Sequence, residues 1–93
     1  MLPTTPHFIL YSKPGCHLCE GLEDKLRQIS SVADDLEIRD ITTHEPWFNR
    51  YSLEIPVLCW FVEGQETELP RFSPRATVAH IESRVCRYVE TAQ

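Results

Sequence analysis

Apolar residues gather in short runs along the chain, and their spacing predicts three strands and a weaker fourth. Residues 7–12 are rich in strand-forming side chains and end at a Pro-Gly turn signal. Residues 36–41 alternate apolar and polar positions, as expected of a strand with one solvated face. Residues 56–62 are nearly all apolar, as in a strand buried on both faces. Residues 67–72 are a weaker candidate, because their proline suits only an edge or an end of a strand.

Three segments carry apolar residues at helical spacing. The first follows the turn after residue 15, and its apolar face consists of Leu18, Leu22, Leu26 and Ile29. A short helix is predicted over residues 43–51, with Thr43 as N-cap and Pro46 in its first turn. The last helix is predicted to open with Ser73 as N-cap and Pro74 at its first position. Its buried stripe consists of Val78, Ile81, Val85, Tyr88 and Val89.

The element order is therefore β-α-β-α-β-β-α, which predicts an α/β fold. Helices between strands predict parallel pairing through right-handed crossovers, and the last two strands predict a hairpin. The 93 residues are enough for one domain and too few for two. We expect a single domain over residues 1–93, in which residues 1–6 form a short tail.

Charge and hydropathy limit the function classes. The formal net charge is −5, which argues against nucleic acid as the main partner, because phosphate binding needs clustered Lys and Arg. No stretch approaches the roughly 18–20 apolar residues of a membrane span. The first residues lack the basic start and long apolar run of a signal peptide. We therefore expect a cytoplasmic monomer, a setting in which paired cysteines serve redox chemistry or metal binding more often than structure.

Cys16 and Cys19 form a CxxC pair where the first strand ends and the first helix begins. Unpaired N–H groups and the macrodipole at a helix N-terminus stabilise an anion. We therefore expect the pKa of the Cys16 thiol to lie below the free value of about 8.5. A three-residue step on a helix brings both sulfurs to one side, within disulfide reach. Cys19 is expected to point back toward the core, which leaves Cys16 as the more exposed attacking thiol.

Two alternatives concern the other cysteines and the neighbouring histidine. Four cysteines suffice in number for a Cys₄ zinc site, but Cys59 and Cys86 are single and lie in apolar segments. A CxxC between a strand and a helix favours redox chemistry. We expect Cys59 and Cys86 to be small core residues, with a regulatory thiol as the alternative. His17 either stabilises the Cys16 thiolate as an imidazolium or is a solvent-exposed spacer.

The run Tyr11-Ser12-Lys13-Pro14-Gly15-Cys16-His17-Leu18-Cys19 resembles the signature of short bacterial glutaredoxin-like proteins. Ile55-Pro56 resembles the cis-proline strand start of that family, although an ordinary trans proline would also suit a strand start. The resemblance implies a thioredoxin-like fold, a four-stranded mixed sheet with helices on both faces. It implies Cys16 as nucleophile, Cys19 as resolving thiol, and Lys13 as a residue that stabilises the thiolate and the glutathione carboxylate. It also implies that Ile55 and Pro56 belong to the substrate site.

Two departures from the glutaredoxin pattern concern glutathione. Residues 69–73 read Leu-Pro-Arg-Phe-Ser, where glutaredoxins carry a Gly-Gly pair and an acid that hold the γ-glutamyl end. Glu54 stands two residues before Pro56, where Thr is usual. A carboxylate near the sulfur repels anionic glutathione and opposes thiolate formation. We therefore expect weak glutathione handling, although Leu10, in place of the buried acid of thioredoxins, favours the glutaredoxin side.

The sequence thus predicts a dithiol oxidoreductase without a bound cofactor. Cys16 attacks a protein or small-molecule disulfide, and Cys19 displaces the reduced product. Glutathione or a partner reductase then returns the pair to the dithiol. Two other functions stay open: a binding or sensor module of the same fold with little turnover, and a structural zinc protein.

Overall fold

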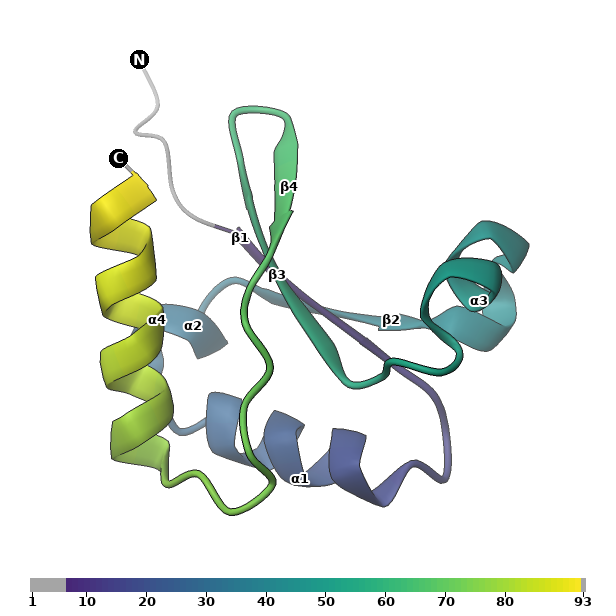
Figure 1. Ribbon diagram of the computed structural model, residues 1–93, viewed down its shortest axis with the longest axis horizontal. Coiled ribbons are helices and arrows are strands. Elements are labelled where there is room, and N and C mark those ends of the chain that lie inside the picture. The colour runs from purple at the N-terminus through teal and green to yellow at the C-terminus, as the bar shows by residue number, and fades with distance from the viewer. Residues whose placement is uncertain (1–6, 93) are drawn as a thin grey trace.

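The helices and strands follow one another in the predicted order, with one further short helix and one further turn. The structure, a computed structural model, describes residues 7–92, and the predicted tail at residues 1–6 lies outside them. The elements are β1 (His7–Ser12), α1 (His17–Leu26), α2 (Ser30–Ala33), β2 (Leu36–Asp40), the 3₁₀ turn η1 (Ile41–Thr43), α3 (Glu45–Tyr51), β3 (Val57–Val62), β4 (Gln65–Glu68) and α4 (Val78–Ala92) (Figure 1). Within residues 7–92, no helix is long and apolar enough to cross a membrane.

The strands form one mixed sheet in the order β2-β1-β3-β4. β1 and β2 are parallel, whereas β3 is antiparallel to both β1 and β4. The mixed sheet and the terminal hairpin are confirmed, but the expected parallel pairing across the second helix is wrong. For β3 to be parallel to β2, the connection between them would have to cross back to the end of the sheet where β2 begins. η1 and α3 do not run back, and β3 begins where β1 ends, with Val57 opposite Tyr11.

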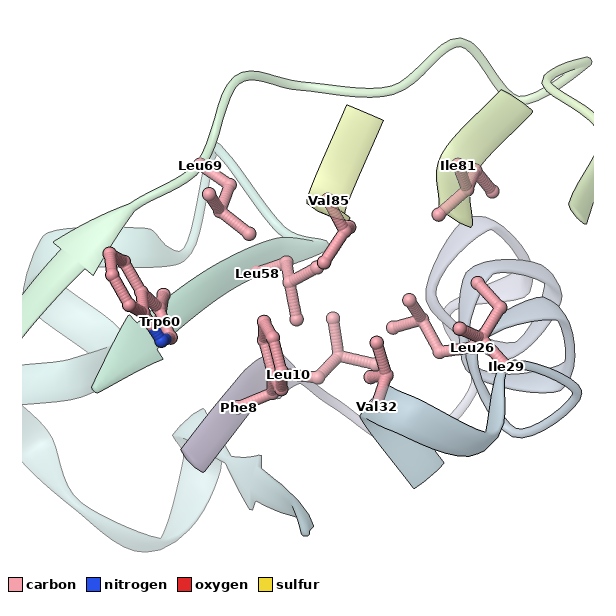
Figure 2. Close-up of a cluster of buried hydrophobic side chains, with 10 residues drawn as sticks. All are labelled: Phe8, Leu10, Leu26, Ile29, Val32, Leu58, Trp60, Leu69, Ile81 and Val85. Carbon is pink, nitrogen blue, oxygen red and sulfur yellow. The ribbon is translucent and has the colours of Figure 1, made fainter. Parts of the chain in front are cut away.

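Alternate side chains of β1 and β3 point to opposite faces of the sheet, so each face has its own apolar core. α1, α2 and α4 cover one face, and the core beneath them is the larger one (Figure 2). Its buried members are Phe8, Leu10, Leu26, Ile29, Val32, Leu58, Trp60, Leu69, Ile81 and Val85. Burial of each such large side chain stabilises the fold by roughly 1.5–3 kcal/mol.

α3 covers the opposite face, as the resemblance implied. The smaller core there consists of Ile9, Tyr11, Ile41, Tyr51, Val57 and Cys59. Tyr51 of α3 stacks on Tyr11 of β1, with ring centroids 4.3 Å apart. Helices therefore lie on both faces of the sheet.

The starts of two helices differ from the prediction. α4 begins at Val78, because the Ser73 hydroxyl accepts the Arg75 N–H in a local turn, while Thr77 accepts the His80 N–H and caps the helix. α3 begins at Glu45 with His44 as N-cap, and Pro46 lies in its first turn as predicted. Thr43, the predicted cap, belongs to η1, where its hydroxyl donates to the Asp40 carbonyl.

Two further differences concern a strand and a cysteine. β4 spans Gln65–Glu68 rather than residues 67–72, since Pro70 has no N–H to continue the ladder. Cys59 is buried as predicted, but Cys86 is exposed, so its assignment to the core is wrong. The buried stripe of α4 passes through Val85, and the next residue along a helix points about 100° away.

Candidate functional site

Cys16 is the N-cap of α1, at the point where the chain leaves β1. Its backbone is extended, with φ −89° and ψ 103°, and its Sγ accepts the Cys19 N–H at 3.2 Å. The Cys16 N–H donates to the Lys13 carbonyl, and Gly15 supplies the positive φ of 81° that this turn requires. The sulfur therefore receives a helix N-terminal amide that has no carbonyl partner within the helix. Such a donor favours negative charge on the sulfur.

The two cysteines are joined by a disulfide, and their Cα atoms lie 5.2 Å apart. Cys19 is 2% exposed and faces the core side of α1, whereas Cys16 is partly exposed. The predicted disulfide reach and the deeper position of Cys19 are confirmed. An incoming sulfur atom therefore meets Cys16 first.

A cavity of about 300 Å³ is lined by His17 and Leu18, the two residues between Cys16 and Cys19, although neither cysteine lines it. One wall is the side of α1 that carries His17, Leu18 and Lys25, and the opposite wall is the segment of residues 68–74. Pro56 and the first residues of β3 lie between the walls. We call this space the groove. Its size is at the lower end of the range found for small-molecule sites.

The Ile55–Pro56 peptide bond is cis, as the resemblance implied. Pro56 lines the groove, and Ile55 is partly exposed beside it. The Ile55 N–H donates to the Tyr51 carbonyl at 3.0 Å, which ties this loop to the end of α3. The structure thus brings Pro56 and the residues around Cys16 to one groove, although they are 40 positions apart in the sequence.

The groove carries charges of both signs. Glu54 is exposed and lines it close to Pro56, and Arg71 is exposed on the opposite wall. Glu68 also lines it and pairs with Arg50 at 3.6 Å. An anionic ligand here would meet at least one carboxylate.

Lys13 and His17, the two predicted tuning residues, occupy different positions. Lys13 is exposed in the turn before Cys16 and is not among the groove-lining residues. His17 lines the groove, its side chain is 96% exposed, and its Nδ1 lies 3.7 Å from a Glu20 carboxylate oxygen. This exposure agrees with the spacer alternative, and the imidazolium alternative stays a prediction.

The remaining cysteines lie away from the redox pair. Cys59 belongs to the core under α3, on the other face of the sheet, and Cys86 is exposed on α4. Burial, reinforced by Glu66, raises the pKa of the Cys59 thiol to about 12. Within residues 7–92, no group of three or more His, Cys, Asp or Glu side chains is placed to hold a metal ion.

Tyr11, the first residue of the motif, does not reach the groove. Its hydroxyl donates to Glu66 at 2.6 Å and accepts from Arg39 at 3.0 Å, on the face that α3 covers. Burial, together with the bond to Glu66, raises the pKa of Tyr11. Its role in the motif is therefore structural.

Lys25 is the groove residue that the sequence did not reveal. The hydrophobic pattern marks it only as a polar position on the first helix. Its Nζ donates to the carbonyls of Pro74 and Ala76, which are 49 and 51 residues away. Lys25 lies three residues after Leu22 and four after Gly21, and residues at these spacings share a helix face. This spacing was the available signal that Lys25 lies on the same face of the helix as those two residues.

A protein-family model described as a glutaredoxin-like domain (DUF836) matches residues 7–85. Comparison with curated proteins gave no match. Among solved structures, a structural-genomics target protein from X. campestris is 22% identical, with 92% of this chain and 99% of that chain covered and a TM-score of 0.62. Thioredoxin 1 from Thermosipho africanus TCF52B is 17% identical, with 92% and 97% covered and a TM-score of 0.62. A malarial protein is 12% identical, with 91% and 98% covered and a TM-score of 0.57. These likenesses confirm the thioredoxin-like fold.

Proposed function

Because the chain belongs to the glutaredoxin-like domain family, we propose that it is a thiol–disulfide oxidoreductase whose redox centre is Cys16 and Cys19. One observation carries this proposal. The sulfur of Cys16 caps α1, accepts a backbone amide and is bonded to the buried Cys19, beside a groove that a substrate can enter. This arrangement supplies a stabilised thiolate, a second thiol to resolve the intermediate and room for the disulfide partner.

The reduced pair transfers two electrons in two exchange steps. The Cys16 thiolate attacks one sulfur of a substrate disulfide, a mixed disulfide forms, and the other substrate sulfur leaves as a thiolate that takes up a proton. The Cys19 thiol then loses its proton and attacks Cys16 Sγ, which releases the second substrate thiol. The result is the Cys16–Cys19 disulfide present in the structure. A two-electron reductant, either glutathione or a reductase, restores the dithiol.

The residues around the pair are assigned secondary roles. Ile55 and Pro56 border the space where the substrate disulfide approaches, and His17 lines its entrance. Lys13 places an exposed cation in the turn before Cys16 and attracts anionic groups near the sulfur. The two-step exchange needs no bound cofactor, metal or second subunit, and a reducing pool such as that of the cytoplasm would sustain it.

The groove favours substrates other than glutathione. Glu54 repels its carboxylates, and Pro70 removes one N–H that could hold the γ-glutamyl group. Arg71 and Lys13 offset this repulsion only in part, because exposed ion pairs contribute about 0–1 kcal/mol each. We therefore propose weak turnover with glutathione and faster reduction by a dithiol or a reductase.

Trapping of the mixed disulfide tests the proposal. Cys19→Ser should accumulate a covalent adduct between Cys16 and a disulfide substrate, seen by intact mass without reductant, whereas Cys16→Ser should accumulate none. Both variants are made with Cys86→Ser, because the exposed Cys86 thiol forms adducts of its own. Equal behaviour of the two variants would contradict the assigned roles. A wild-type protein that forms the disulfide without turning over any substrate would instead be a sensor or binding module.

A further inference from the structure

Beyond Glu68, which ends β4, the groove wall opposite α1 has no helix or strand. This irregular segment runs from Leu69 to Thr77, and Figure 1 shows it descending from β4 to the start of α4. Leu69 is buried, and its N–H donates to the Leu58 carbonyl at 2.9 Å, so the first residue of the wall is fixed to β3. The Ala76 N–H donates to the Ser73 carbonyl at 2.9 Å, a bond inside the segment that does not tie it to the rest of the fold. Phe72 and Ala76 add partial packing against the larger core.

Lys25 ties this wall to α1. Its Nζ donates to the Pro74 carbonyl at 2.9 Å and to the Ala76 carbonyl at 2.7 Å. Across the part of the chain that the structure describes, these bonds are the ones that join residues 70–76 to another element. Both are charge-assisted, which makes them stronger than bonds between neutral groups; the bond to Ala76 is partly buried and the bond to Pro74 is exposed.

Lys25 is far from the reacting sulfurs. It lies nine residues after Cys16 on the same helix, which corresponds to about 13 Å along the axis at 1.5 Å per residue. It nevertheless lines the groove together with Leu18, Pro56 and Phe72. Its effect on chemistry must therefore pass through the shape of the groove.

We propose that Lys25 is a positioning residue, which holds the wall of residues 70–76 at the distance from α1 that a substrate filling the groove requires. This inference rests on the proposed function of the Cys16–Cys19 pair. Polypeptide disulfides extend from the sulfur into the groove and depend on the wall. Small disulfides that contact only the surroundings of Cys16 do not.

Kinetics with two substrates of different size test the proposal. Lys25→Met keeps the length of the side chain and removes its hydrogen-bond donors, and Lys25→Arg restores donors. Arg27→Met is the matched control, because it removes a nearby cation that pairs with Glu23. With dithiothreitol as reductant, Lys25→Met should raise KM for insulin at least fivefold and lower the turnover of β-hydroxyethyl disulfide by a much smaller factor, less than twofold. Lys25→Arg should recover most of the loss, and Arg27→Met should behave as wild type. An equal loss on both substrates, or none on insulin, would overturn the proposal.

Amide exchange supplies a readout that does not need turnover. In Lys25→Met the Ala76 amide should exchange at least several-fold faster by NMR, since its local turn loses the anchor. The Glu20 amide, which donates to the Cys16 carbonyl at 3.0 Å, is the reference and should be unchanged. Unchanged exchange at Ala76 refutes the proposal whatever the kinetics show. A wild-type protein inactive on every disulfide would refute the proposed function, while exchange at Ala76 would still show whether Lys25 holds the wall.

Discussion

Among single residues, the charged side chains at the groove bear on the weak use of glutathione proposed above. Glu54 is exposed and lines the groove near Pro56. In the proposed function, its carboxylate repels the carboxylates of glutathione. The neighbouring cation on the other wall, Arg71, is exposed to solvent and compensates weakly.

We expect Glu54→Thr to raise glutathione-driven turnover by up to about fivefold. This figure corresponds to removal of roughly 1 kcal/mol of repulsion between exposed charges. The assay is reduction of β-hydroxyethyl disulfide with glutathione and glutathione reductase. Turnover driven by dithiothreitol, which has no carboxylate, is the control and should stay the same. A wild-type rate equal to that of a standard dithiol glutaredoxin would contradict weak glutathione handling.

The sequence indicated some of these residues and not others for a physical reason. Cys16 and Cys19 are three positions apart, and Pro56 belongs to a recognisable strand start, so local patterns found them. Lys25 acts on carbonyls 49 and 51 residues away. Every residue carries a backbone carbonyl, so no sequence pattern could show which carbonyls accept hydrogen bonds from Lys25.

At the scale of elements, α1 carries one apolar stripe with two different environments. Leu26, near the end of the helix, is fully buried in the larger core. Leu18, in the first turn, is 54% exposed and lines the groove. Helical periodicity placed both on one apolar face, because spacing shows which residues share a face and not what covers that face. The part of the stripe near Cys16 lines the groove instead of the core.

The two leucines should therefore differ in their effect on stability. Leu26→Ala leaves a cavity in a packed core and should lower the free energy of unfolding by about 2–5 kcal/mol. Leu18→Ala removes a half-exposed side chain and should lower it by less than about 1 kcal/mol. Urea unfolding of the oxidised proteins measures both values. Equal losses would show that Leu18 belongs to the core.

The side chain of His7, a titratable group, links the start of β1 to β2 and the residue before it. His7 Nδ1 lies 2.9 Å from Asp35, and its Nε2 lies 2.9 Å from Glu37. The hydrogen bond to Glu37 is the main cause that raises the pKa of His7 above its usual 6.5, and Asp35 adds to it. A raised folded-state pKa stabilises the fold fully below the unfolded value, and this contribution is lost as pH rises through the folded value.

We therefore expect His7→Gln to destabilise the protein more at pH 5.5 than at pH 8.5. The difference should be about 1 kcal/mol or less, since the partner carboxylates are 43% and 41% exposed. Denaturant unfolding of wild type and variant at the two pH values measures it. His80→Gln, at an exposed position of α4, is the matched control variant. An equal loss at both pH values would contradict a charged His7 bridge.

Element order was predictable, whereas strand direction was not. Tertiary pairing decides direction, and here Val57 pairs with Tyr11 at the end of β1 rather than with β2. The starts of α3 and α4 shifted by a few residues because several Ser, Thr and Pro residues near each start can cap a helix or form a turn. Local sequence patterns do not distinguish between such candidate N-cap residues, because the packing of the whole fold decides which of them caps the helix.

At the scale of the whole molecule, the sheet separates Cys59 from the Cys16–Cys19 pair, and Cys86 lies on the outside of α4. Cys16 and Cys19 lie at the start of α1, on the side of the larger core. Cys59 projects from β3 to the other face and is 1% exposed, and Cys86 is exposed on α4. Redox chemistry at the pair can therefore proceed without the other two thiols. A site that used all four cysteines would need them on one side of the sheet.

Replacement of the two outlying thiols tests this separation. Cys59→Ala combined with Cys86→Ser should keep turnover of β-hydroxyethyl disulfide, driven by dithiothreitol, within about twofold of wild type. Cys86→Ser alone should change stability by less than about 0.5 kcal/mol, as is usual at the surface, and Cys59→Ala should cost more because it opens space in a buried core.

Metal analysis of the purified wild-type and variant chains accompanies the assay. A Cys₄ zinc site predicts stoichiometric zinc in the wild type and its loss with any of the four changes. Redox chemistry confined to Cys16 and Cys19 predicts that replacement of either Cys16 or Cys19 abolishes turnover. Cys59 cannot take their place, because burial raises the pKa of its thiol to about 12, so that it supplies no thiolate at neutral pH.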